Sequence, residues 1–132
     1  MPPRILSKLY EAGSLRNTET GFELAFKNTI APSTLIEIGP LIVDGASYAS
    51  EQMIVRLERP SERPGRQPSV REWQVKVVNE EKDRLLSFDL HTVAYVLVKG
   101  QPLPPGQHAV TLNVKTKEVG EIILTAEDSV AE

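Results

Sequence analysis

Cysteine is absent from the 132 residues of this sequence, which excludes disulfides, thiolate metal sites and cysteine nucleophiles. A basic excess is also absent: 15 Lys and Arg residues stand against 18 Asp and Glu residues, and the net charge is −3. Nucleic acids and anionic lipids are bound by basic surfaces, so we expect neither as a partner. Aromatic platforms for sugars are scarce, since the chain has one Trp, three Tyr and three Phe.

Long apolar runs are missing too. No stretch approaches the length of a membrane-spanning helix, and residues 1–6 contain no apolar core of a signal peptide. We therefore expect a soluble cytoplasmic protein. The length fits one compact domain over residues 1–132, and 40% hydrophobic with 25% charged residues is typical of a globular chain.

The dominant pattern is an alternation of large apolar residues with polar or small ones, which is the period of a half-buried β-strand. It occurs in residues 21–28, 73–77 and 110–115. Aliphatic runs too short for helices lie at 35–38, 41–43, 53–57, 85–90, 93–98 and 121–125. The sequence therefore predicts an all-β fold: an antiparallel β-sandwich, immunoglobulin-like or jelly-roll-like, of about nine or ten short strands and no amphipathic helix of three turns.

Turn residues agree with this prediction. Asp44-Gly45 predicts a type I′ hairpin turn, because both central positions of that turn need a positive φ. Residues 79–84 form a polar connector. Residues 100–106 contain three prolines and two glycines, so they end the strands on either side.

Residues 59–71 interrupt the strand pattern with prolines at 60, 64 and 68 and arginines at 59, 63, 66 and 71. Most connections in compact domains have about four to six residues, so we predict an unusually long loop here. The interpretation that we favour is a mobile, solvated hairpin tip. The alternative is an arm that binds a partner, because proline limits the entropy lost on ordering and arginine makes forked hydrogen bonds.

Residues with catalytic or metal-binding chemistry are sparse. Asp89 and His91 place two potential ligands on one strand face, which is too few for a tight metal site, and we expect His91 to be structural or on the surface. We expect His108 to make a structural hydrogen bond. Glu37 is the carboxylate to inspect for a raised pKa, although we expect it to face outward. Gly-x-Ser-x-Gly and glycine-rich phosphate loops are missing, so we predict no catalytic, cofactor or metal residues on this chain.

Four motifs occur in a fixed order along the chain. They are Gly13-Ser14-Leu15-Arg16-Asn17, Gly21-Phe22-Glu23-Leu24, Leu41-Ile42-Val43-Asp44-Gly45 and Leu103-Pro104-Pro105-Gly106-Gln107-His108-Ala109-Val110. The ordered set resembles the small β subunit of bacterial C-glycoside deglycosidases, over residues 13–114. Residues 59–71 match no part of that pattern.

The resemblance implies an accessory β-sandwich subunit that is inactive alone. Its partner would be a larger α subunit, similar to sugar-phosphate isomerase and epimerase barrels, which carries a divalent metal, manganese. The complex would cleave the carbon–carbon bond of 3-oxo-C-glucosides with flavonoid-type aglycones by deprotonation and elimination, a lyase reaction. Two alternatives stay open: a stand-alone β-sandwich module that binds carbohydrate or protein, and a small enzyme that uses surface carboxylates.

A hetero-oligomeric subunit needs an interface, which should bury more than about 1,000 Å². We predict it at the long loop and at the proline-rich turn. The candidate residues are Arg59, Arg63, Arg66, Arg71, Pro102, Leu103, Pro104 and Pro105.

Overall fold

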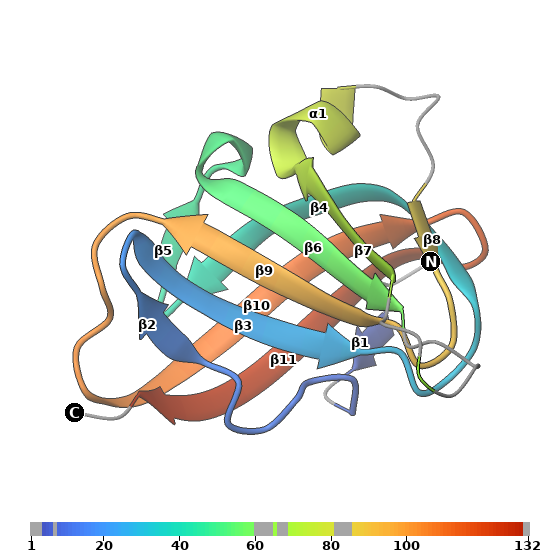
Figure 1. Ribbon diagram of the computed structural model, residues 1–132. Coiled ribbons are helices and arrows are strands. Elements are labelled where there is room, and N and C mark those ends of the chain that lie inside the picture. The colour runs from blue at the N-terminus through green and yellow to red at the C-terminus, as the bar shows by residue number, and fades with distance from the viewer. Residues whose placement is uncertain (1–3, 7, 60–64, 66–68, 81–85, 131–132) are drawn as a thin grey trace.

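The computed structural model describes residues 4–6, 8–59, 65, 69–80 and 86–130, which form two facing β-sheets (Figure 1). The first sheet contains β1 (Arg4–Leu6), β11 (Gly120–Val130), β10 (Gly106–Thr116), β4 (Ser33–Val43) and β5 (Ala46–Tyr48), with β8 (Leu86–Phe88) also paired to β4. The second sheet contains β2 (Arg16–Thr18), β3 (Gly21–Lys27), β9 (Val93–Lys99), β6 (Met53–Arg59) and β7 (Ser69–Gln74).

Neighbouring strands are antiparallel, except that β1 runs parallel to β11. Buried apolar residues from the facing sides of both sheets form one core. In β9 the alternation is regular: Ala94, Val96 and Val98 are buried, and the residues between them are half-exposed. The predicted antiparallel all-β sandwich is confirmed, with the pairing of β1 and β11 as the parallel exception.

Strand β3 departs from the predicted half-buried pattern. Glu23 and Ala25, expected on a solvent face, are only 5% and 2% exposed. Glu23 forms an ion pair with Arg16. Strand β2 pairs with β3 only as far as Glu23, and the N-terminal segment bonds to the rest of that edge. The Ser14 hydroxyl accepts the Ala25 N–H at 2.9 Å, and Leu9 O accepts the Lys27 N–H at 2.7 Å. The prediction that one face of this strand is exposed to solvent was wrong, because the N-terminal segment lies along the strand.

The predicted strand over residues 73–77 is also corrected. Strand β7 ends at Gln74, and the short helix α1 (Val75–Glu80) follows directly. Val75 and Val78 are both fully buried, three residues apart, which is a helical spacing. Asn79 then bonds both backbone groups of Ile38, accepting its N–H and donating to its C=O at 2.8 Å each, so the helix is tied to β4.

Strand β4 ends in a tight turn and contains an irregularity at its middle. Asp44 and Gly45 have φ values of 51° and 86°, which confirms the predicted hairpin turn. The runs 35–38 and 41–43, expected as separate strands, form one strand through Gly39 and Pro40. The register with β10 shifts at this point, and a shifted register tolerates the missing N–H of proline.

Helical structure in the described residues is limited to α1 and the 3-10 turn η1 (Ser50–Gln52). Neither has the length or the apolar character needed to cross a membrane.

Candidate functional site

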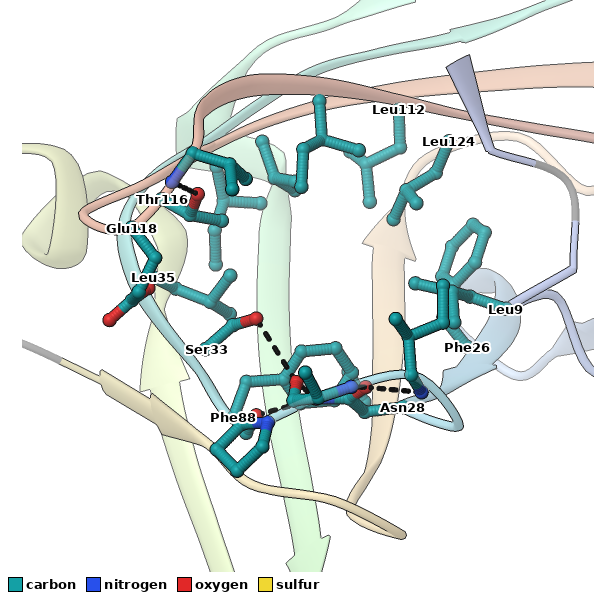
Figure 2. A pocket seen from close by; sticks show the side chains of 18 of the residues that line it. Leu9, Phe26, Asn28, Ser33, Leu35, Phe88, Leu112, Thr116, Glu118 and Leu124 are labelled. Atoms are coloured by element: carbon teal, nitrogen blue, oxygen red, sulfur yellow. Dashed lines mark hydrogen bonds between the residues drawn. The ribbon is translucent and has the colours of Figure 1, made fainter. Parts of the chain in front are cut away.

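A cavity of about 250 Å³ lies between the two sheets, where β4 and β9 begin and β3 and β10 end (Figure 2). Its wall is made by buried apolar side chains from both sheets and from the N-terminal segment. They are Leu9, Phe26, Leu35, Ile38, Val55, Phe88, Ala94, Val96, Leu112, Val114, Ile122 and Leu124. A dry cavity of roughly 150 Å³ with a similar lining accepts benzene, so this one has room for a ring-sized molecule or a short chain.

Asn28 holds one side of the cavity mouth, at the end of β3. The side chain is 2% exposed and makes four hydrogen bonds. Its amide donates to Ala31 O and Phe88 O at 2.7 Å each, and its oxygen accepts the N–H groups of Ile30 and Ala31 at 3.1 and 3.3 Å. The loop between β3 and β4 is thus fixed to β8 without help from a ligand.

Glu118 holds the opposite side of the mouth, in the turn between β10 and β11. Its carboxylate accepts the backbone N–H and the hydroxyl of Thr34 at 2.8 Å each. These bonds, the backbone one first, hold the pKa of Glu118 below its ordinary value. Thr116 closes the same turn by donating to Gly120 O at 3.1 Å and accepting the Val119 N–H at 3.2 Å.

The mouth presents apolar side chains to solvent. Ile30 is 57% exposed and Val119 is 45% exposed, and both line the cavity. The remaining polar lining residue, Ser33, donates to Ala31 O at 3.3 Å. Because the polar side chains of the lining are hydrogen-bonded within the protein, the site offers contact area to an apolar ligand and few polar groups to a hydrophilic one.

Metal binding finds no support among the described residues, which contain no group of three or more His, Asp or Glu placed to hold an ion. The predicted strand position of Asp89 and His91 was wrong: both lie in the turn between β8 and β9. Asp89 forms an ion pair with Arg59 at 3.2 Å. The exposed His91 has a φ of 70°, and its N–H donates to Asn28 O at 2.7 Å.

The predicted structural role of His108 is confirmed. Its Nδ1 lies 2.5 Å from the Asp44 carboxylate and its Nε2 lies 2.7 Å from Pro104 O. An ionised Asp44 and the Pro104 carbonyl are both acceptors, so the protonated ring can donate to each, and the bonds to Asp44 and Pro104 raise the pKa of His108. The Ala109 N–H, and then His108, hold the pKa of Asp44 low. This cluster joins the β4–β5 hairpin to the loop before β10.

The candidate interface residues fall into two groups. Arg59 and Arg71 are not loop residues: they belong to β6 and β7, whose hairpin is paired as far as Arg59 and Ser69. Arg63 and Arg66 lie outside the described residues. The interface prediction itself stays a prediction.

In the proline-rich turn, Pro102, Pro104 and Pro105 are exposed, whereas Leu103 is 8% exposed and belongs to the core. The backbone of Leu103 is bonded by the side chain of Asn17 in both directions at 2.8 Å. Leu103 therefore serves the internal packing of the chain rather than its surface.

Other site expectations have simpler outcomes. Glu37 is half-buried, opposite Lys115 on the neighbouring strand.

The sequence did not predict the cavity between the sheets. One signal for it is Ala94, a small residue at an inward position of β9 where the next two inward residues are valines.

These features define an all-β sandwich domain with an apolar interior cavity. The family model of the hydroxymethylglutaryl-CoA reductase N-terminal domain matches residues 5–131, and the chain belongs to this family. A comparison with curated proteins finds no match. One similar solved structure is a family 123 glycoside hydrolase from Clostridium perfringens, described in connection with glycolipid glycan hydrolysis. It aligns over 100% of this chain and 24% of its own, with 12% identity and a TM-score of 0.40, so the chain spans about a quarter of that protein.

The resemblance to C-glycoside deglycosidase β subunits was wrong, because the family model that covers almost the whole chain describes a different family. The motifs that carried it are used to build the sandwich. Asn17 bonds to Leu103, and Asp44 bonds to His108, so these residues join the loops at one end of the fold. The barrel partner and its manganese lose their basis with that resemblance.

Proposed function

We propose that this chain is a non-catalytic binding domain that holds an apolar small molecule, ring-sized or short-chained, in the cavity between its sheets. The observation that carries the proposal is the cavity of about 250 Å³ with an apolar wall and a mouth fixed by internal hydrogen bonds. The family name identifies a reductase domain by its position and names no ligand for it. A cytoplasmic location stays a prediction.

The cost of leaving the cavity empty supports a ligand. Cavities in protein cores destabilise the fold by about 24 cal/mol per Å³, which for this volume gives at most about 6 kcal/mol. A whole domain is stable by only about 5–15 kcal/mol. Contact with solvent at the mouth lowers this cost, and an apolar ligand would recover part of the remainder through burial.

The mouth also bears on the chemistry of the ligand. A sugar would bring many hydroxyl groups into a space whose own polar groups are already paired, and each unpaired buried group costs about 1–3 kcal/mol. The proposal therefore departs from the carbohydrate-binding alternative and favours a hydrocarbon or aromatic ligand.

A pair of variants on one strand tests the proposal with toluene as the probe. Val96 and Val98 lie two residues apart on the inner face of β9, but only Val96 lines the cavity. We expect toluene to raise the thermal midpoint of the wild type and to shift the methyl NMR signals of Leu35, Leu112 and Leu124. Val96→Phe should fill the space and abolish both effects.

The matched control Val98→Phe adds the same side chain where no space exists, so we expect a loss of about 1–3 kcal/mol in unfolding free energy with toluene binding retained. Toluene binding that survives Val96→Phe, or the absence of any methyl shift in the wild type, would contradict the proposal.

A further inference from the structure

A second hollow, of about 230 Å³, lies where the β6–β7 hairpin meets β8 and the turn that follows it. Unlike the cavity, it is lined largely by polar side chains. Phe88 of β8 lines the cavity, whereas Leu86 and Ser87 of the same strand line this second hollow, which we call the arginine cleft. Its other lining residues come from β6, β7 and the turn 89–92.

The strand register places Arg71 on the inner face of the second sheet. Residues directly opposite each other share a face, and Val55 faces Trp73, Leu57 faces Arg71, and Arg59 faces Ser69. Val55 and Leu57 are buried, so this is the face turned toward the other sheet. The inner face thus changes from apolar to cationic along the hairpin, and the cleft lies over this change.

The charges of the described lining residues do not cancel, since Arg59 and Arg71 stand against Asp89. Arg59 forms an ion pair with Asp89 at 3.2 Å. Arg71 forms no ion pair with any carboxylate among residues 4–6, 8–59, 65, 69–80 and 86–130. Among the described lining residues, one positive charge therefore remains without an ion-pair partner, on a guanidinium whose planar fork matches the two oxygens of a carboxylate.

Thr92 supplies the second, independent observation. This residue is one of those that line the cleft, and it is 2% exposed. The backbone of Thr92 is paired, since its N–H donates to Asp89 O and its C=O accepts the Asn28 N–H, at 3.0 Å each. The hydroxyl, in contrast, is buried and has no hydrogen-bond partner among the described residues. A buried hydroxyl without a partner is costly, and a ligand atom in the cleft would provide one.

We propose that the arginine cleft binds a small monocarboxylate with an apolar, ring-sized body. The Arg71 guanidinium pairs with the carboxylate, the Thr92 hydroxyl donates to it, and Trp73 with the leucines of the floor contacts the body. Asp89, the acidic residue among the described lining residues, would repel a phosphate dianion more strongly than a monoanion. This site is separate from the apolar cavity and does not depend on the function proposed for it.

Trp73 is the one tryptophan of the chain and lines the cleft, so its fluorescence reports on binding there. Benzoate is the probe, with benzyl alcohol as a neutral molecule of similar shape and inorganic phosphate as an anion without an apolar body. We expect a saturable fluorescence change with benzoate and binding of the other two that is weaker by about tenfold or more.

Three substitutions separate the charges. Arg71→Gln should weaken benzoate binding by about tenfold or more. Asp89→Asn should strengthen it, because Arg59 is then released from its ion pair. Lys115→Gln removes the same charge from an exposed position of the first sheet and should leave binding unchanged.

Thr92→Val distinguishes a ligand contact from a structural role. The Thr92 hydroxyl has no hydrogen-bond partner in the described part of the chain, so we expect weaker benzoate binding without a fall in the unfolding midpoint of the free protein. Benzoate binding that is absent in the wild type, or equal in Arg71→Gln, would overturn the proposal and leave Arg71 as an inward charge that protects the edge strand β7. Toluene binding in the cavity should persist in Arg71→Gln, so failure at one site is distinguishable from failure at the other.

Discussion

The two ends of the sandwich are formed by the same long strands (Figure 1). The cavity lies at one end, which we call the open end, and side-chain hydrogen bonds join the loops at the other, which we call the closed end. At the closed end, His108 joins Asp44 to Pro104, and Asn17 bonds the backbone of Leu103. At the open end, Asn28 and the turn at Glu118 make comparable bonds, but they frame a cavity.

The difference lies in the apolar side chains rather than in the polar ones. At the closed end the rings of Phe22 and Tyr48 meet edge to face, with centroids 5.2 Å apart, and Leu103 packs into the core. At the open end the inward residues of β9 are Ala94 and Val96, which leave volume between the sheets. An edge-to-face pair also lies at the open end, where the ring centroids of Tyr10 and Phe26 are 5.5 Å apart. The open end therefore differs in the volume that the small inward side chains of β9 leave between the sheets.

Removing the frame of the open end should have the largest effect. Asn28→Ala leaves two carbonyls and two N–H groups without their partner, so we expect a loss of about 3 kcal/mol in unfolding free energy and weaker toluene binding. Urea denaturation measures the unfolding free energy, and the thermal shift with toluene measures binding. Asn113→Ala is the control, a half-buried residue of β10 without side-chain hydrogen bonds in the described structure, and it should change stability by less than about 0.5 kcal/mol. Equal effects of the two variants would contradict the role given to Asn28.

The closed end should respond to pH, with a smaller effect. The raised pKa of His108 means that its contribution to stability is complete below the ordinary value of 6.5 and is lost as pH rises through the folded-state pKa. The lowered pKa of Asp44 means that its contribution is complete above 3.8 and is lost as pH falls through the folded-state value. The cluster is therefore strongest between these two ordinary values.

His108→Gln tests this window. We expect it to lower the unfolding free energy by about 1–2 kcal/mol near pH 6, because the charged bond from the buried ring to Asp44 is lost. The loss should be smaller near pH 9, where the wild-type ring has lost its proton and contributes less. Urea titrations at both pH values measure the difference. His91→Asn is the control, since His91 is an exposed turn residue with a φ of 70° that asparagine tolerates. A difference that stays constant with pH would show that His108 does not act through its charge.

Local features of the fold were predictable from the sequence because they depend on neighbouring residues. Asp44-Gly45 specifies its turn through backbone φ alone, and the alternation in β9 reports which side chains point inward. The valines at 75 and 77 were wrongly assigned to a strand, because a short apolar segment can fit a strand or a helix. The burial of Val78, which favours the helix, is visible only in the structure.

The cavity and the arginine cleft were not predictable in this way. A cavity is volume that side chains do not fill, and it depends on the separation of two sheets that the sequence does not encode locally. The arginine cleft likewise requires the pairing of Leu57 with Arg71, a register between β6 and β7 that the sequence does not show locally. Arg59 and Arg71 were predicted as interface residues in a loop. The three prolines between them in the sequence concealed that each belongs to a strand.

The smallest effect is expected at the rim of the open end. Glu118→Gln keeps an oxygen that can accept from Thr34 but removes the charge, so stability near pH 7 and toluene binding should change little. The lowered pKa of Glu118 means that its contribution is complete above the ordinary value of 4.5 and is lost as pH falls through the folded-state pKa. The variant should therefore have a flatter acid-unfolding curve, measured by circular dichroism. Glu121→Gln, at an exposed position of β11, should follow the wild type. If Glu118→Gln instead abolishes toluene binding, the mouth depends on charge, and the open end would resemble the closed one more than its hydrogen bonds indicate.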